Sequence, residues 1–195
     1  MAQKSTSEGL RVRDQIEKTL LKSRRIFLSD GVDSETANAI IEKLWYLDIE
    51  EPGKQILLII NSPGGTVDSG FAIWDQVQMI SSPVATLVTG LAASFGSVLS
   101  LCAPKGKRYA TKNARIMAHQ PLLRAVIRGQ ATDLEIQARE MLKMRKALVD
   151  LYAEATGKSQ EVIESIITRD SWFSAQEALE FGLIDQIVSS FDEVE

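Results

Sequence analysis

Ser94 and His119 are the two residues of this 195-residue chain whose types and settings best suit catalytic chemistry. Ser94 follows an apolar, β-branched run at 83–88 and a glycine at position 90, and it precedes the small and apolar residues 95–103. The first run is typical of a buried strand and the second of a buried helix. We therefore expect Ser94 on a strand-to-helix turn, where unpaired backbone N–H groups and the helix dipole can stabilise a developing oxyanion.

His119 is the only histidine in the sequence, so a serine nucleophile activated by histidine must use it as its base. It follows the short apolar run 116–118, and Pro121 should end the strand that carries it. A histidine at a strand end can also be a satisfied structural residue, and Ser94 alone can be a helix N-cap. From the residues themselves, both interpretations stay open.

Five short segments along the chain carry a resemblance to one protein family. They are I-N-S-P-G-G at 60–65, G-L-A-A-S at 90–94, M-A-H-Q-P at 117–121, G-Q-A-T-D at 129–133 and R-D-S-W-F-S-A at 169–175. Together they resemble the proteolytic subunit of Clp protease (ClpP), and the match runs over residues 25–188. None of these motifs would suffice alone, but five in this order are specific.

The resemblance implies a serine protease site built from several of these segments. It implies Ser94 as the nucleophile, His119 as the base and Asp170 as the acid that orients the base. It further implies an oxyanion hole made by the backbone N–H groups of Gly65 and Phe95. No metal is expected in such a site, and one histidine with one cysteine also argues against zinc.

The resemblance also implies where substrate and neighbouring subunits bind. Arg169 is expected to pair with a carboxylate across a contact between two rings. The implied assembly is two stacked heptamers, of this chain alone or mixed with a sister subunit, which receive unfolded polypeptide from an AAA+ unfoldase. The chain has no Walker A sequence, so we expect no cofactor here and ATP used by the partner. The expected substrate-binding strand at 122–128 contains Leu122, Leu123, Arg124, Ala125 and Val126.

Composition argues against several other classes of protein. The formal net charge of −4 supplies no basic surface for nucleic acid. The single cysteine, Cys102, cannot form an internal disulfide and suits a reducing compartment. The uncharged stretch 76–104 is interrupted by Pro83 and Gly90, so we expect no membrane span. With no secretory signal at the N-terminus, the expected location is cytoplasmic.

The remaining patterns predict an α/β fold in which strand–helix–strand units position the site. By resemblance this is a ClpP/crotonase-like stack of βαβ units with a protruding handle helix and strand, forming one domain over 1–195. The N-terminal segment is 1–24 and the handle region is 122–156. We expect strands at 26–28, 55–60, 83–88 and 184–188, a mobile stretch at 1–9, helices at 10–22, 34–47, 66–80 and 131–156, and a solvated basic hairpin at 105–109.

Two alternatives to a Clp-type serine endopeptidase remain at this point. One is a catalytically weak or silent ring subunit with the same fold. The other is a crotonase-type acyl-CoA hydratase or isomerase, which shares the fold and the backbone oxyanion hole but needs a carboxylate base in its pocket. Labelling by a serine-directed fluorophosphonate separates the three, because only an active serine enzyme should react at Ser94.

Overall fold

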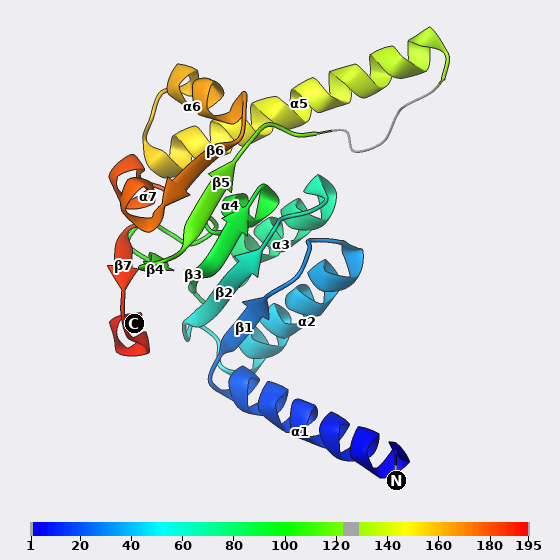
Figure 1. Cartoon of the computed structure of the whole chain (residues 1–195), viewed down its shortest axis with the longest axis vertical. Coiled ribbons are helices and arrows are strands. Elements are labelled where there is room, and N and C mark those ends of the chain that lie inside the picture. The colour runs from blue at the N-terminus through cyan, green and yellow to red at the C-terminus, as the bar shows by residue number, and fades with distance from the viewer. Residues whose placement is uncertain (1, 123–128, 195) are drawn as a thin grey trace.

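The computed structural model of the chain describes residues 2–122 and 129–194 and confirms the predicted α/β class. Within these ranges, seven α-helices accompany one seven-stranded sheet (Figure 1). The elements in chain order are α1 Ala2–Lys22, β1 Arg25–Leu28, α2 Ser34–Glu50, β2 Ile56–Ser62, α3 Val67–Met79, β3 Val84–Ala93, α4 Phe95–Leu99, β4 Arg108–Thr111, β5 Arg115–Ala118, α5 Ala131–Thr156, α6 Gln160–Ile167, β6 Ser171–Ser174, α7 Ala175–Phe181, β7 Gln186–Val188 and the 3₁₀-helix η1 Phe191–Glu193.

The sheet has the strand order β1-β2-β3-β4-β7, and all of these neighbours are parallel. Strand β3 extends past the residues that pair with β4, and its last residues pair with β5 in the parallel direction, with Ala93 opposite Met117. Strand β5 in turn pairs with β6 in the antiparallel direction, with Ala118 opposite Ser171. This order brings the ends of β3, β5 and α6 together, although they are far apart in the sequence.

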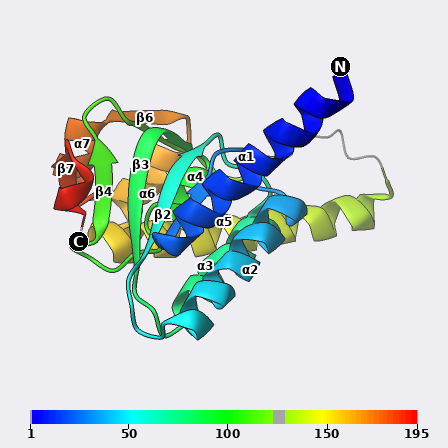
Figure 2. The same ribbon diagram turned by 90° about the horizontal axis from the view of Figure 1, so that it is seen from below.

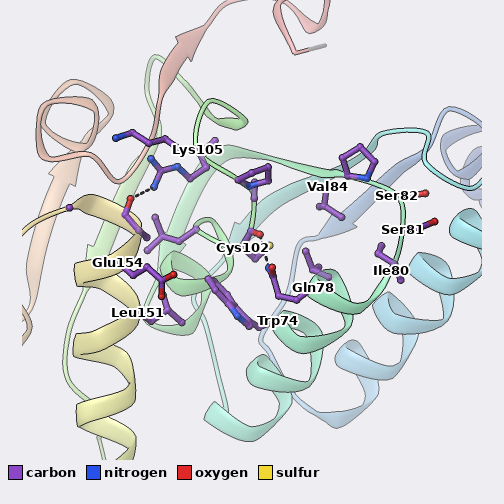
Figure 3. A pocket seen from close by; sticks show the side chains of 18 residues that line it. Trp74, Gln78, Ile80, Ser81, Ser82, Val84, Cys102, Lys105, Leu151 and Glu154 are labelled. Atoms are coloured by element: carbon purple, nitrogen blue, oxygen red, sulfur yellow. Dashed lines mark hydrogen bonds between the residues drawn. The ribbon is translucent and has the colours of Figure 1, made fainter.

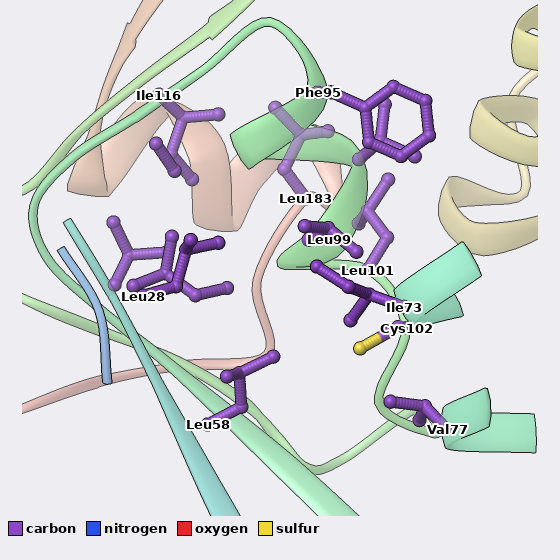
Figure 4. Close-up of a cluster of buried hydrophobic side chains, with 14 of the residues drawn as sticks. Leu28, Leu58, Ile73, Val77, Phe95, Leu99, Leu101, Cys102, Ile116 and Leu183 are labelled. Carbon is purple, nitrogen blue, oxygen red and sulfur yellow. The ribbon is translucent and has the colours of Figure 1, made fainter. Parts of the chain in front are cut away.

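The core lies between the sheet and the helices that cover it. Strand β2 is apolar without alternation because both of its faces are buried, as is usual for parallel sheets. Figure 4 shows Leu28 and Leu58 from the sheet in one cluster with Ile73 of α3 and with Phe95 and Leu99 of α4. Full burial of one such side chain stabilises the fold by about 1.5–3 kcal/mol, so the short helix α4 is held mainly by its packing.

Two long helices project from this body, α1 and the first half of α5 (Figures 1 and 2). Helix α5 has the predicted bounds and ends at Gly157, which is in the left-handed conformation. Its two ends differ: Leu134 and Leu142 are exposed, whereas Tyr152 is buried in the core. The apolar pattern on the projecting half of α5 therefore has no cover within the described part of this chain.

The N-terminal segment departs from the sequence-based expectation. Helix α1 begins at Ala2, whereas the sequence predicted a mobile stretch followed by a helix from residue 10. Its apolar residue Ile16 is 55% exposed. The last part of α1 packs against β1, and Glu17 forms an ion pair with Lys43 of α2 at 2.6 Å. Within residues 2–122 and 129–194, no helix combines the length and apolar character needed to cross a membrane.

The prediction of a solvated hairpin at 105–109 is wrong. Arg108 is buried and begins β4, a parallel strand between β3 and β7. Its guanidinium donates from Nε to Oδ2 of Asp185 at 2.9 Å and from Nη1 to the carbonyl of Ala155 at 2.9 Å. Burial acts to raise the pKa of Asp185, but the hydrogen bonds and charge of Arg108 outweigh it and hold that pKa below its usual value. The charge pattern of 105–109 could not show this distant partner.

Candidate active site

Ser94 occupies the junction between β3 and α4, as the sequence predicted. Its backbone angles are φ 54° and ψ −125°, a combination that side-chain-bearing residues rarely adopt. Such a conformation costs about 1–3 kcal/mol and persists only where surrounding contacts hold it. The strained turn lifts the side chain out of the strand while the backbone enters the helix.

The peptide groups on both sides of Ser94 are held by hydrogen bonds. Its N–H donates to the carbonyl of Met117 on β5 at 2.9 Å. Its carbonyl accepts from the N–H groups of Ser97 at 3.0 Å and Val98 at 3.4 Å in α4. The turn is therefore fixed to the sheet on one side and to the helix on the other, and these contacts offset the strain.

His119 follows β5 and faces Ser94 directly. The distance from His119 Nε2 to Ser94 Oγ is 2.7 Å, a normal hydrogen-bond length for these atoms. The next residue, Gln120, anchors the chain by donating from its N–H to the carbonyl of Ile167 at 2.7 Å. This geometry suits the transfer of the hydroxyl proton of Ser94 to the imidazole, which would make the serine oxygen a nucleophile.

Asp170 lies on the other side of the imidazole, just before β6. Its Oδ1 is 3.4 Å from His119 Nδ1, and its side chain is 62% exposed. The distance suits an ion pair, yet Nδ1 is a buried atom without a hydrogen-bond partner among the described residues. A carboxylate orients an imidazole only by accepting its N–H proton, and this arrangement lacks that hydrogen bond. Asp170 is thus adjacent to the histidine but not yet engaged with it.

The backbone N–H groups of Gly65 and Phe95 make no hydrogen bond within the described part of the chain. Phe95 is the first residue of α4, where helix N–H groups have no partner within the helix. Gly65 follows Gly64, and both residues lie in the loop between β2 and α3. Both free N–H groups belong to residues that line the pocket at Ser94, so they are available to an oxyanion formed there.

The pocket at Ser94 has a volume of about 50 Å³. Its lining includes Leu122, which is 60% exposed, together with Val67, Val98 and Leu148. Nothing in the sequence distinguishes these three aliphatic residues, because an apolar residue that lines a pocket has the same local pattern as one in the core. The residues of the described part that line this pocket include no carboxylate, which a crotonase-type base would require.

The structure does not test the role of several other predicted residues. Leu123, Arg124, Ala125 and Val126 lie outside the described residues, so their substrate-binding role stays a prediction. Arg169 is exposed beside Asp170 and makes no ion pair within residues 2–122 and 129–194. The described part of the chain also contains no group of three or more His, Cys, Asp or Glu side chains that could hold a metal ion.

A larger cavity of about 630 Å³ lies away from Ser94, between α3 and the second half of α5 (Figure 3). Trp74, Leu151 and Glu154 line it, and Gln78 donates to the carbonyl of Cys102 at 3.0 Å on its wall. Burial raises the pKa of the Cys102 thiol to about 12, so the thiol is neutral and unsuited to nucleophilic attack. The small pocket, not this cavity, brings a nucleophile and a base together.

Known proteins match this chain over nearly its whole length. The family model described as Clp protease matches residues 7–191. A protein from Protochlamydia amoebophila (strain UWE25), named ATP-dependent Clp protease proteolytic subunit 1, is 65% identical over 182 residues, which are 93% of this chain and 88% of the relative. Proteins of the same name from Chlamydia muridarum (strain MoPn / Nigg) and Chlamydia trachomatis serovar D are 59% and 58% identical, each over 184 residues, which are 94% of this chain and 96% of the relative.

Proposed function

The chain belongs to the Clp protease family, and from that premise we propose that it is a serine endopeptidase in which Ser94 is the nucleophile and His119 the general base. One observation carries this proposal, the 2.7 Å contact between His119 Nε2 and Ser94 Oγ at the start of a helix. The free N–H groups of Gly65 and Phe95 at the same pocket add the stabilisation that acyl transfer requires.

The proposed reaction has two steps. In the first, Ser94 Oγ attacks the scissile carbonyl while His119 Nε2 takes the hydroxyl proton, and the oxyanion is stabilised by the N–H groups of Gly65 and Phe95. The imidazolium then returns this proton to the leaving amine. In the second step, water attacks the acyl-enzyme with His119 again as base, which releases the carboxylic acid and restores the serine.

Asp170 is proposed to hold the imidazole of His119 in the tautomer that leaves Nε2 free to accept a proton. This role requires that Oδ1 of Asp170 move closer to Nδ1 than its present 3.4 Å and align with the N–H bond. The exposure of Asp170 and of its neighbour Arg169 leaves room for such a shift. We propose that Arg169 makes a contact between rings and thereby places Asp170 within hydrogen-bond distance of His119 Nδ1.

We further propose that the chain works inside an oligomeric chamber, in two stacked rings, on unfolded polypeptide delivered by an AAA+ unfoldase. The exposed apolar residues Leu134, Ile136 and Leu142 on the projecting half of α5 support a contact with another subunit. The words "ATP-dependent" and "subunit" in the names of the relatives support the same interpretation. ATP would be used by the unfoldase, and the site of this chain would work without a cofactor.

Labelling with a fluorophosphonate tests the central proposal. The wild-type protein should be labelled at Ser94 and should cleave short peptides, whereas Ser94→Ala should lose the label and at least about 10⁴-fold in kcat. Ser165→Ala is the matched control, because Ser165 is an exposed serine on α6 and its loss should change neither result. Light scattering should show the same oligomer for all three proteins.

Two other outcomes would assign the chain differently. An assembled wild-type protein that is neither labelled nor active on peptides would indicate a silent ring subunit. Turnover of an acyl-CoA with equal rates in wild type and Ser94→Ala would indicate a crotonase-type enzyme. Either result would refute the proposal of a Ser94 nucleophile.

A further inference from the structure

A buried pair of hydroxyl groups links helix α5 to the nucleophile turn. The phenol oxygen of Tyr152 lies 2.5 Å from Oγ of Ser97, and the two residues are 55 positions apart in the sequence. Tyr152 is on α5 and Ser97 is on α4. Both are fully buried, at 1% and 0% exposure. The serine hydrolase mechanism proposed above uses neither group.

The direction of these hydrogen bonds follows from the number of protons available. Ser97 Oγ is 2.7 Å from the carbonyl oxygen of Ser94, which can only accept, so the single hydroxyl proton of Ser97 is donated there. In the hydrogen bond between Ser97 and Tyr152, the proton must then come from the phenol. Tyr152 therefore donates to Ser97, and Ser97 donates to the carbonyl of Ser94.

The endpoint of this chain of hydrogen bonds is the strained residue of the site. The carbonyl of Ser94 receives three bonds, from the N–H groups of Ser97 and Val98 and from the hydroxyl of Ser97. The side-chain bond is the shortest of the three, at 2.7 Å. It holds the peptide group that follows Ser94 and so helps to maintain the ψ of −125° at this strained residue, whose Oγ faces His119.

We propose that Tyr152 is a positioning residue for Ser94, which it orients from helix α5 through the hydroxyl of Ser97. This inference rests on the proposed function, because it assigns a task toward the same nucleophile. It adds a contribution from α5 to the site. The phenol fixes the rotamer of Ser97, so the serine proton stays directed at the Ser94 carbonyl.

The environment of Tyr152 supports a permanent donor role. Burial raises the pKa of the phenol to about 12, and the hydrogen bond with Ser97 lowers it by less. The phenol is therefore protonated at neutral pH and always has its proton to donate. The same α5 helix carries the exposed residues Leu134 and Leu142 on its projecting half, so the hydroxyl pair also ties this projecting element to the nucleophile turn.

Enzyme kinetics on the assembled full-length chain tests the inference. Tyr152→Phe keeps the ring and removes only the phenol oxygen, and it should lower kcat about 2- to 10-fold, the range expected for one lost neutral hydrogen bond, with KM unchanged. Ser97→Ala removes the whole link and should lower kcat at least as far. The double variant should match Ser97→Ala, because Tyr152 acts only through Ser97.

Tyr109→Phe is the matched control. Tyr109 is also buried, but it lies in the second hydrophobic cluster and its phenol makes no hydrogen bond within the described residues. Its loss should leave kcat and KM unchanged. Wild-type kcat in Tyr152→Phe or in Ser97→Ala would overturn the inference, and so would additive losses in the double variant. If Tyr152→Phe fails to assemble, the kcat of Ser97→Ala still tests the inference, because that variant also removes the link to the Ser94 carbonyl.

A second measurement keeps this inference separate from the proposed function. Hydrogen exchange followed by mass spectrometry should show faster exchange at the N–H groups of Ser97 and Val98 in Tyr152→Phe, since both donate to the Ser94 carbonyl. This readout does not require activity. A wild-type protein without fluorophosphonate labelling would refute the proposed function, whereas unchanged exchange in Tyr152→Phe would refute the positioning role.

Discussion

Replacing Gly64 by alanine should disable the site without removing any group that takes part in the chemistry. Gly64 lies in the loop after β2 with φ +82°, directly against the nucleophile turn. A Cβ atom there would be 2.4 Å from the carbonyl oxygen of Ala93 and 2.8 Å from both the N atom of Phe95 and Cβ of Ser94. Two of these three neighbours are backbone atoms, so the turn itself must move to accept the methyl group.

The variant Gly53→Ala is a control that separates the cost of the steric clash at position 64 from the cost of left-handed backbone strain. Gly53 has nearly the same φ, +78°, but nothing lies within 4 Å of its added Cβ. Both variants therefore carry the left-handed strain of a non-glycine residue, about 1–2 kcal/mol. Only Gly64→Ala adds overpacking, about 1–3 kcal/mol more. Because a displacement of about 1 Å in a catalytic group costs on the order of 10²-fold in rate, Gly64→Ala should lose about that factor in kcat/KM.

Peptide hydrolysis and thermal unfolding, measured at equal subunit concentration, check this reasoning. Gly53→Ala should have wild-type kcat/KM and a melting temperature lowered by about 2–4 °C per kcal/mol of strain. Gly64→Ala should be less stable still and nearly inactive. Equal activity in the two variants would refute the argument, because it would mean that the methyl group at position 64 is accommodated without moving Ser94.

Three further predictions concern other parts of the molecule. Arg108→Met should destabilise the fold by about 3 kcal/mol, because it leaves the carboxylate of Asp185, which is 14% exposed, with only backbone N–H donors and no guanidinium partner. The surface variant Arg145→Met should cost under about 1 kcal/mol, and thermal unfolding compares the two. Since the folded pKa of Asp185 is lowered, the contribution of this pair should be complete above the ordinary Asp pKa of about 4 and lost as the pH falls through the lower folded value. The buried Cys102 thiol, with its pKa near 12, should resist iodoacetamide at pH 8 in the native protein and react after unfolding, as mass spectrometry can determine. Arg169→Ala should lower both oligomer mass and peptidase activity, and a mutant that keeps the full assembly and full activity by light scattering and kinetic assay would contradict the proposed coupling.

The sequence by itself determined the elements that position the site. The apolar run at 55–60 forms most of β2, and Ser94 lies at the strand-to-helix junction where the pattern placed it. Helix α5 has the predicted bounds 131–156 and ends at Gly157, and Ser174 forms a local capping box with Glu177. These features depend on hydrophobic periodicity and on contacts between residues a few positions apart, so the local sequence contains the information that specifies them.

Only the tertiary structure decided which polar groups meet across the fold. Arg108 finds Asp185 77 positions away, and Tyr152 finds Ser97 55 positions away. The chain has 26 acidic residues, and nothing in the pattern at 105–109 indicates which of them would neutralise a buried arginine. A buried polar group must be paired with whatever lies next to it in space, and its neighbours are set by the strand order and by the packing of α4 against α5 rather than by sequence distance.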